Sequence, residues 1–241
     1  MDIPKGLVTI VLGPSGTGKS VFLKHLVGLL RPDRGRVLVG DDNISILRGQ
    51  ALYDVRKRFG VLFQDGALFG SMTVYDNTAF PLREHTRKPE AEIRHIVMEK
   101  LDLVGLRGAE LKFPGEISGG MRKRAGLARA LVLDPEIILF DEPDSGLDPV
   151  RTAFLNELVL DLKAQTGATM IIVTHHIPSA AQIADYIGLL FRRRLVSFGP
   201  KENMFTSKDP VVKQFLAGAT DGPIGMSEEK DRPSDADGSA S

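Results

Sequence analysis

Short apolar runs alternate with stretches of helical periodicity along most of the chain. Residues 7–12 (LVTIVL) form a β-branched run between glycines, which is typical of a buried strand in a parallel sheet. Apolar residues then recur near helical spacing until Arg31 and Pro32 end the pattern. Further strands are predicted at 36–40, 59–64, 136–140 and 170–174, with a final pair within 188–199. Strands that alternate with helices imply βαβ crossovers, so we predict an α/β fold with a mostly parallel sheet.

The middle of the chain has helical periodicity instead, which predicts a helical subdomain inserted at 66–126. The core would then comprise 1–65 and 127–215, followed by a C-terminal extension at 216–226. Residues 227–241 contain almost no apolar side chains and are expected to be a disordered acidic tail. Because no internal repeat is visible, we expect residues 1–226 to form a single unit.

A glycine-rich segment, GPSGTGKS, follows the first predicted strand and opens the first predicted helix, as the phosphate-binding P-loop requires. Its glycines allow successive N–H groups to turn inward around an anion. Lys19 supplies a point charge for the β- and γ-phosphates, and the Ser20 hydroxyl is a hard oxygen ligand for Mg²⁺. The candidate nucleotide-binding residues are Gly13, Pro14, Ser15, Gly16, Thr17, Gly18, Lys19 and Ser20.

Polar residues end three other predicted strands. Asp141 and Glu142 follow EIILF, Gln64 closes VLFQ, and His175 closes MIIVTH. Ligands of an open α/β sheet bind at the carboxyl ends of its strands, so these side chains could approach one nucleotide. Asp141 would stand beside Mg²⁺, and Glu142 would face the attacking water. The alternative is that the two acidic residues only cap the next helix.

A second glycine elbow, formed by Ser118, Gly119 and Gly120, opens another helical pattern. A helix N-terminus with free N–H groups favours an anion, so this elbow is a second candidate phosphate contact. The basic residues at 122–124 follow directly, and we interpret them as a solvated or partner-facing helix surface.

Together these motifs resemble the nucleotide-binding subunit of ABC transporters. GPSGTGKS is similar to Walker A, Gln64 to the Q-loop glutamine, ISGGM to the signature motif and IILFDE to Walker B. SGLD, which ends at Asp148, is similar to the D-loop, and His175 to the switch histidine. The resemblance implies an ATPase with a RecA-like P-loop core, ATP and Mg²⁺ as cofactors, and metal ligands Ser20, Gln64 and Asp141. It also implies a head-to-tail homodimer in which Ser118, Gly119, Gly120 and Asp148 complete the partner's ATP site.

A narrower resemblance, to the ATPases of Mce-type lipid importers, covers residues 63–86 together with VVKQFLAG and DGPIG. It extends over nearly the whole chain for the ATPase shared by actinobacterial Mce systems. It implies a permease partner, contacted through the segment around residues 64–86, and a phospholipid, sterol or fatty acid as cargo. Apolar residues there, namely Ala67, Leu68, Phe69 and Met72, could instead be subdomain core.

This sequence departs from the family pattern at several positions. Ile117 replaces the usual signature leucine, Gly146 a common D-loop alanine, and Met121 a glutamine, the last of which favours the lipid-importer branch. ABC ATPases also carry an upstream strand with an aromatic residue that stacks on adenine, and the residues before Gly13 lack it. We therefore expect the N-terminal antiparallel β-subdomain to be incomplete and the natural protein to begin further upstream.

Composition limits the partners and the cellular location that we expect for this protein. The formal net charge is +0, there are no cysteines, and no apolar run reaches the roughly 20 residues of a membrane-spanning helix. We expect neither nucleic-acid binding nor direct membrane insertion, and a cytoplasmic protein held on the inner face of the cell membrane by its permease. An ATPase for another transported substrate is the main alternative. A soluble ABC ATPase or a P-loop kinase or GTPase fits the sequence less well.

Overall fold

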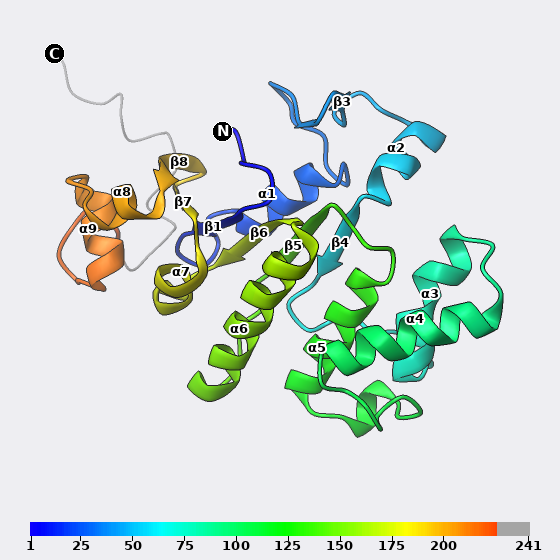
Figure 1. The fold of residues 1–241 in the computed structure, drawn as a ribbon. Coiled ribbons are helices and arrows are strands. Elements are labelled where there is room, and N and C mark those ends of the chain that lie inside the picture. The colour runs from blue at the N-terminus through cyan, green and yellow to red at the C-terminus, as the bar shows by residue number, and fades with distance from the viewer. Residues whose placement is uncertain (226–241) are drawn as a thin grey trace, which may run out of the picture.

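The protein is described by a computed structural model over residues 1–225, so the tail expected at 227–241 lies outside the described residues. Within that range the centre of the fold is a six-stranded sheet (Figure 1). Its order is β4-β5-β6-β1-β7-β8, parallel except for the antiparallel pair β7 and β8. The strands are β1 (Val8–Leu12), β4 (Phe59–Leu62), β5 (Ile137–Asp141), β6 (Thr169–Thr174), β7 (Tyr186–Phe191) and β8 (Arg194–Pro200).

Both faces of this sheet are covered, which explains why β1 and β6 are apolar without alternation. On one face, Val11 packs with Leu23 and Val27 from the helix that follows the P-loop. On the other, Ile10 belongs to the larger core cluster, which includes Leu162. The α/β fold with a mostly parallel sheet is therefore confirmed.

The helices and short elements fill the intervals between the strands. They are α1 (Lys19–Leu26), α2 (Gly49–Arg56), α3 (Val74–His85), α4 (Glu90–Leu103), a 3₁₀ turn (Pro114–Glu116), α5 (Gly119–Leu131), α6 (Pro149–Thr166), α7 (Ile177–Ile183), α8 (Lys201–Phe205) and α9 (Pro210–Ala217). The strand predicted at 36–40 is only β2 (Leu38–Val39), which pairs with β3 (Asp42–Asn43) in a separate antiparallel ribbon. The first helix ends before the predicted stop, because Gly28 adopts a positive φ of 65°.

Helices α3, α4 and α5 pack together at one end of the molecule (Figure 1). Buried Asn77 ties the start of α3 to the preceding loop, because its amide donates to the carbonyls of Phe69, Met72 and Thr73. α5 also packs against β4, where Gly126 leaves room for the backbone of Gly66. The same helix thus joins the inserted helices to the sheet, and it runs through residue 126 to Leu131.

The turn between β7 and β8 contains only residues 192–193, because Phe191 pairs with Arg194. Arg192 and Arg193 have φ angles of 48° and 58°. Two-residue hairpin turns with positive φ at both positions favour Asn-Gly, and the left-handed region costs other residues about 1–2 kcal/mol each. Two arginines are an unfavourable choice for this turn on backbone grounds alone.

Candidate functional site

The P-loop lies at the carboxyl edge of the sheet, between β1 and α1. Gly13 is required there because a Cβ atom would lie 2.3 Å from the carbonyl oxygen of Leu190 on the neighbouring strand. Gly18 precedes α1 with a φ of 98°, a conformation that side chains disfavour. The Thr17 hydroxyl donates to the carbonyl of Pro14 over 2.9 Å and closes the loop. The backbone therefore has the sharp turn that a phosphate cradle requires.

Lys19 places a buried positive charge beneath this loop. Its side chain is only 4% exposed, and Nζ donates to the carbonyls of Gly13 and Pro14, both over 2.9 Å. The third neighbour is Glu142, whose Oε1 lies 3.3 Å from Nζ. The ammonium is thus fixed in position by two carbonyls and one carboxylate, as a charge in a buried site must be.

Ser20 and Asp141 meet across the site although they lie far apart in the sequence. The Ser20 hydroxyl donates to Asp141 Oδ1 over 2.8 Å, from the first turn of α1 to the end of β5. A hydroxyl and a carboxylate oxygen are the hard donors that Mg²⁺ prefers alongside water and phosphate oxygens, so these two residues fit the ion. Within residues 1–225 no group of three or more His, Cys, Asp or Glu could hold a metal ion by itself.

Gln64 also reaches this edge of the sheet. Its Nε2 lies 3.4 Å from the Ser145 hydroxyl, so the amide contacts the loop after β5. Among the described contacts, none joins Gln64 to Ser20 or Asp141. Its role as a metal ligand stays a prediction.

Glu142 occupies the centre of the site between two basic groups. Its Oε2 lies 3.6 Å from Nδ1 of His175, opposite the contact with Lys19. The His175 side chain is 51% exposed, whereas that of Glu142 is 18% exposed. Glu142 has a φ of 45°, and its N–H donates to Val173, which anchors this strained turn to β6.

The helix-cap alternative for Asp141 and Glu142 is wrong, because the next helix begins at Pro149 and its N-cap is Asp148. Asp148 accepts from the N–H of Arg151 over 3.0 Å. His176, beside the site histidine, accepts from the N–H of Ser179 at the start of α7.

Two buried charged residues that the motif analysis missed support the turn around Glu142. Lys123 is 6% exposed and donates to the carbonyls of Pro143, over 3.0 Å, and of Ser145. Burial lowers its pKa, although neighbouring carboxylates oppose that effect. Asp144 is also buried, and both of its carboxylate oxygens accept from the Thr174 hydroxyl at 2.8 Å.

The expectation that residues 122–124 form a solvated or partner-facing surface is therefore wrong for Lys123, which is buried. Lys123 points into the protein, and Arg124 donates to the carbonyls of Val104 and Gly105. The sequence held a signal for this, because Lys123 lies four residues before buried Leu127 and thus on the same helix face. A lysine at a core-facing position of a helix can thus be buried despite its charge, because its ammonium donates to buried carbonyls.

The second elbow lies at the N-terminus of α5. Ser118 is the N-cap and accepts from the N–H of Met121 over 3.3 Å. A Cβ on Gly120 would approach Leu147, in the loop before α6, and Arg151, in the first turn of α6. Within residues 1–225, no hydrogen bond or ion pair joins this elbow to the P-loop of the same chain. Within the described part of one chain, the two candidate phosphate contacts are therefore not linked by any bond.

Apolar side chains are exposed just after β4. Phe63 and Phe69 are 40% and 46% exposed, and Ala67 is exposed with a φ of 47°. Leu68 packs against the core cluster, and Met72 is half-buried. The core interpretation therefore fails for Ala67 and Phe69 and holds for Leu68.

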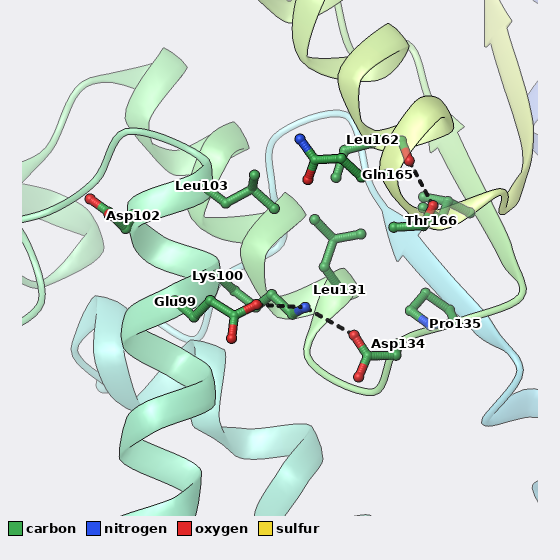
Figure 2. A pocket seen from close by; sticks show the side chains of 11 residues that line it. Glu99, Lys100, Asp102, Leu103, Leu131, Asp134, Pro135, Leu162, Gln165 and Thr166 are labelled. Atoms are coloured by element: carbon green, nitrogen blue, oxygen red, sulfur yellow. Dashed lines mark hydrogen bonds and ion pairs between the residues drawn. The ribbon is translucent and has the colours of Figure 1, made fainter.

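A separate cavity of about 530 Å³ opens between α4 and α6 (Figure 2). Lys100 crosses its rim and binds Asp134 over 2.9 Å. Burial lowers the pKa of Lys100, but the bond to Asp134 and other carboxylate contacts reverse this and raise it overall. None of the candidate site residues lines this cavity.

Comparisons with known proteins find relatives over most of the chain. The family model described as ABC transporter matches residues 1–145. The chain is 66% identical over 240 residues to the "Probable ribonucleotide transport ATP-binding protein mkl" of Mycobacterium leprae, covering 100% of this chain and 69% of the relative. The Mycobacterium tuberculosis H37Rv protein of the same name is 67% identical over 231 residues, which cover 96% of this chain and 64% of that relative. The chain thus spans about two thirds of the length of these relatives.

A more distant relative and two solved structures extend the comparison. The "Intermembrane phospholipid transport system ATP-binding protein MlaF" of Escherichia coli K12 is 44% identical over 93% of this chain and 83% of its own. The "Dimeric structure of a post-hydrolysis state of the ATP-binding cassette MJ0796 bound to ADP and Pi" has a TM-score of 0.78 at 29% identity, covering 83% and 88%. The structure of cbiO1 from Clostridium perfringens also has a TM-score of 0.78, at 31% identity, and the match covers 90% of this chain and 86% of that one. That protein is described as part of the ABC transporter complex cbiONQ. Over residues 1–225, no helix has the length and apolar character needed to cross a membrane.

Proposed function

Because this chain belongs to the ABC transporter family as an ATP-hydrolysing, ATP-binding subunit, we propose that it powers Mce-type lipid transport through a partner permease. The observation that carries the ATPase chemistry is the position of Glu142 between Lys19 and His175. The lipid assignment is supported by the likeness to MlaF and by residues 63–86. A ribonucleotide is the competing cargo, because the mycobacterial relatives carry that description.

ATP would bind with its phosphates in the loop formed by residues 13–20. Lys19 would exchange its contacts with backbone carbonyls for phosphate oxygens, and the loop N–H groups would surround the β-phosphate. Mg²⁺ would be held by Ser20 and Asp141, with Gln64 as a further ligand directly or through water, and would neutralise phosphate charge.

Hydrolysis would depend on the two residues that face each other across the site. Glu142 would accept a hydrogen bond from the attacking water and polarise it as a general base. The strained turn at Glu142 would hold its carboxylate in position for this. His175 would contact the γ-phosphate and respond to its loss, which suits a half-exposed side chain.

A second copy of the chain would complete each site. Ser118, Gly119 and Gly120 would reach the partner's γ-phosphate with the N-terminus of α5, and Asp148 would lie at the same interface. This is supported by the absence of contact between elbow and P-loop within one chain and by the dimeric relative at 29% identity.

The permease would dock on the exposed apolar segment after β4. Phe63, Ala67 and Phe69 offer a surface suited to a partner helix. The protein would thereby be held on the inner face of the cell membrane. The helical unit at 66–126 would move against the core at 1–65 and 127–215, and 216–226 would form a C-terminal extension.

The ATPase mechanism is tested by Glu142→Gln. We expect ATP binding to be retained and phosphate release to fall by about 10²–10⁴-fold, because the general base is lost. Ser118→Arg should abolish turnover without weakening ATP binding to isolated monomers. Retained hydrolysis in Glu142→Gln would remove Glu142 from this role.

The cargo is tested by purifying the chain with its permease and reconstituting the complex in proteoliposomes. ATP-dependent movement of a fluorescent phospholipid, absent in Glu142→Gln, would support lipid transport. Movement of a labelled ribonucleotide without lipid movement would overturn the lipid assignment and leave the ATPase assignment intact.

A further inference from the structure

Three consecutive arginines, residues 192–194, lie at the sheet edge that holds the P-loop. β7 runs parallel to β1, with Leu189 opposite Leu12, so both strands end at this edge (Figure 1). The contact is close, since a Cβ on Gly13 would lie 2.3 Å from the carbonyl oxygen of Leu190. The turn follows directly after β7, so its backbone lies near the start of the P-loop, within reach of long side chains.

The backbone of this turn works against arginine. Arg192 and Arg193 both have positive φ, where Asn-Gly would be more stable. Charged residues at strained positions suggest a role for the side chains themselves. The guanidinium of Arg192 lies over the Phe191 ring, 5.1 Å from its centroid. Arg193 and Arg194 are exposed and, in the part of the chain that the structure describes, form no ion pair.

The charged side chains Lys19, Asp141 and Glu142 of the nucleotide site together carry no net positive charge, so attraction of an anion there depends on the backbone N–H groups. The positive group of this site is Lys19, which is buried and already paired with Glu142, while Asp141 adds a second carboxylate. The chain as a whole has a formal net charge of +0, so no global field compensates. ATP is a polyanion, and a local positive group near the loop would raise its rate of encounter.

We propose that the arginine turn, residues 192–194, steers the polyphosphate of nucleoside triphosphates into the P-loop. This rests on the proposed binding of ATP at residues 13–20. Arg193 acts on the approach of the nucleotide rather than on the bound state. Its loss therefore lowers the association rate constant and leaves the dissociation rate constant unchanged.

Three substitutions at one position separate charge from backbone strain. Arg193→Gln removes the charge and keeps the strain, Arg193→Gly removes both, and Arg193→Lys keeps both. Lys5→Gln is the control, because it removes an exposed charge just before β1, at the opposite edge of the sheet. Binding of a fluorescent ATP analogue is followed by stopped flow at low and high salt, and stability by thermal unfolding.

We expect the association rate constant to fall about threefold to tenfold at low salt in Arg193→Gln and Arg193→Gly, with a weaker salt dependence. Arg193→Lys and Lys5→Gln should match the unchanged protein. Arg193→Gly should also melt about 2–4 °C higher, because relief of strain stabilises the hairpin. Equal association rates in all variants would overturn the proposal, and so would a slower rate in Lys5→Gln. A failure of ATP binding itself would appear instead as no saturable binding by the unchanged protein.

Discussion

Lys123 offers a direct test of how the turn around Glu142 is held in place. Its ammonium donates to the buried carbonyls of Pro143 and Ser145, which flank that turn. Lys123→Met keeps the length and apolar stem of the side chain but leaves both carbonyls without this donor. Hydrogen bonds from a charged donor are worth about 1.5–3 kcal/mol each. Removing a buried ammonium also relieves its desolvation, which is the main cause of its lowered pKa.

The two effects oppose each other, and the lost bonds outweigh the relief. We expect the free energy of unfolding to fall by about 2 kcal/mol, which corresponds to about 4–8 °C in Tm. Turnover should fall by about tenfold to a hundredfold, because a displaced Glu142 no longer aligns the water. ATP affinity should change little, since Lys123 does not touch the P-loop.

Urea unfolding followed by circular dichroism measures the first effect, and phosphate release measures the second. Lys24→Met is the matched control, because Lys24 is exposed on α1 and should be neutral within about 0.5 kcal/mol. If Lys123→Met were as stable and as active as this control, the support assigned to Lys123 would be refuted.

Two further predictions concern the inserted helices. The Thr73 hydroxyl and the Arg83 guanidinium lower the pKa of Asp76 below 3.8, so this carboxylate stabilises the fold above that pH and ceases to do so as the pH falls through its lowered value. In Asp76→Asn, the free energy of unfolding measured by urea titration should therefore depend less on pH between about pH 5 and 2. At neutral pH the variant should lose under about 1 kcal/mol, because the ion pair with Arg83 is partly exposed. An unchanged pH dependence in this acidic range would contradict the prediction. Gly126→Ala should lower the free energy of unfolding by about 1–3 kcal/mol in thermal melts, because its Cβ would lie 2.8 Å from Gly66, and an unchanged Tm would contradict this packing.

Elements with a strong local signal were predictable. β1 and the P-loop were evident because a glycine-flanked apolar run precedes a motif whose residue types have few alternatives. The extent of α1 was overestimated, because Leu30 keeps helical spacing although Gly28 ends the helix. The strand predicted at 36–40 forms over only two residues, because a strand also needs a partner to pair with and the residue types of one segment do not show how long that pairing is.

In the candidate site too, some residues were predictable from local motifs and others were not. Lys19, Ser20, Asp141, Glu142 and His175 were all proposed from motifs, and the structure brings them together at one sheet edge. The buried pair that supports the site was missed, because Lys123 and Asp144 look like ordinary surface charges in sequence. Their roles depend on carbonyls and a hydroxyl contributed by other segments.

The sequence by itself determined the α/β class, the P-loop and the strand-end carboxylates, because spacing and residue type encode local backbone conformation and local chemistry. Only the tertiary structure decided that Lys123 is a buried support and that the arginine turn stands beside the P-loop. Both depend on contacts between segments far apart in the chain: the packing of α5 against the loop after β5 buries Lys123, and the register of β1 and β7 places the arginine turn. Helix packing and strand register are properties of the folded chain, which no single segment carries.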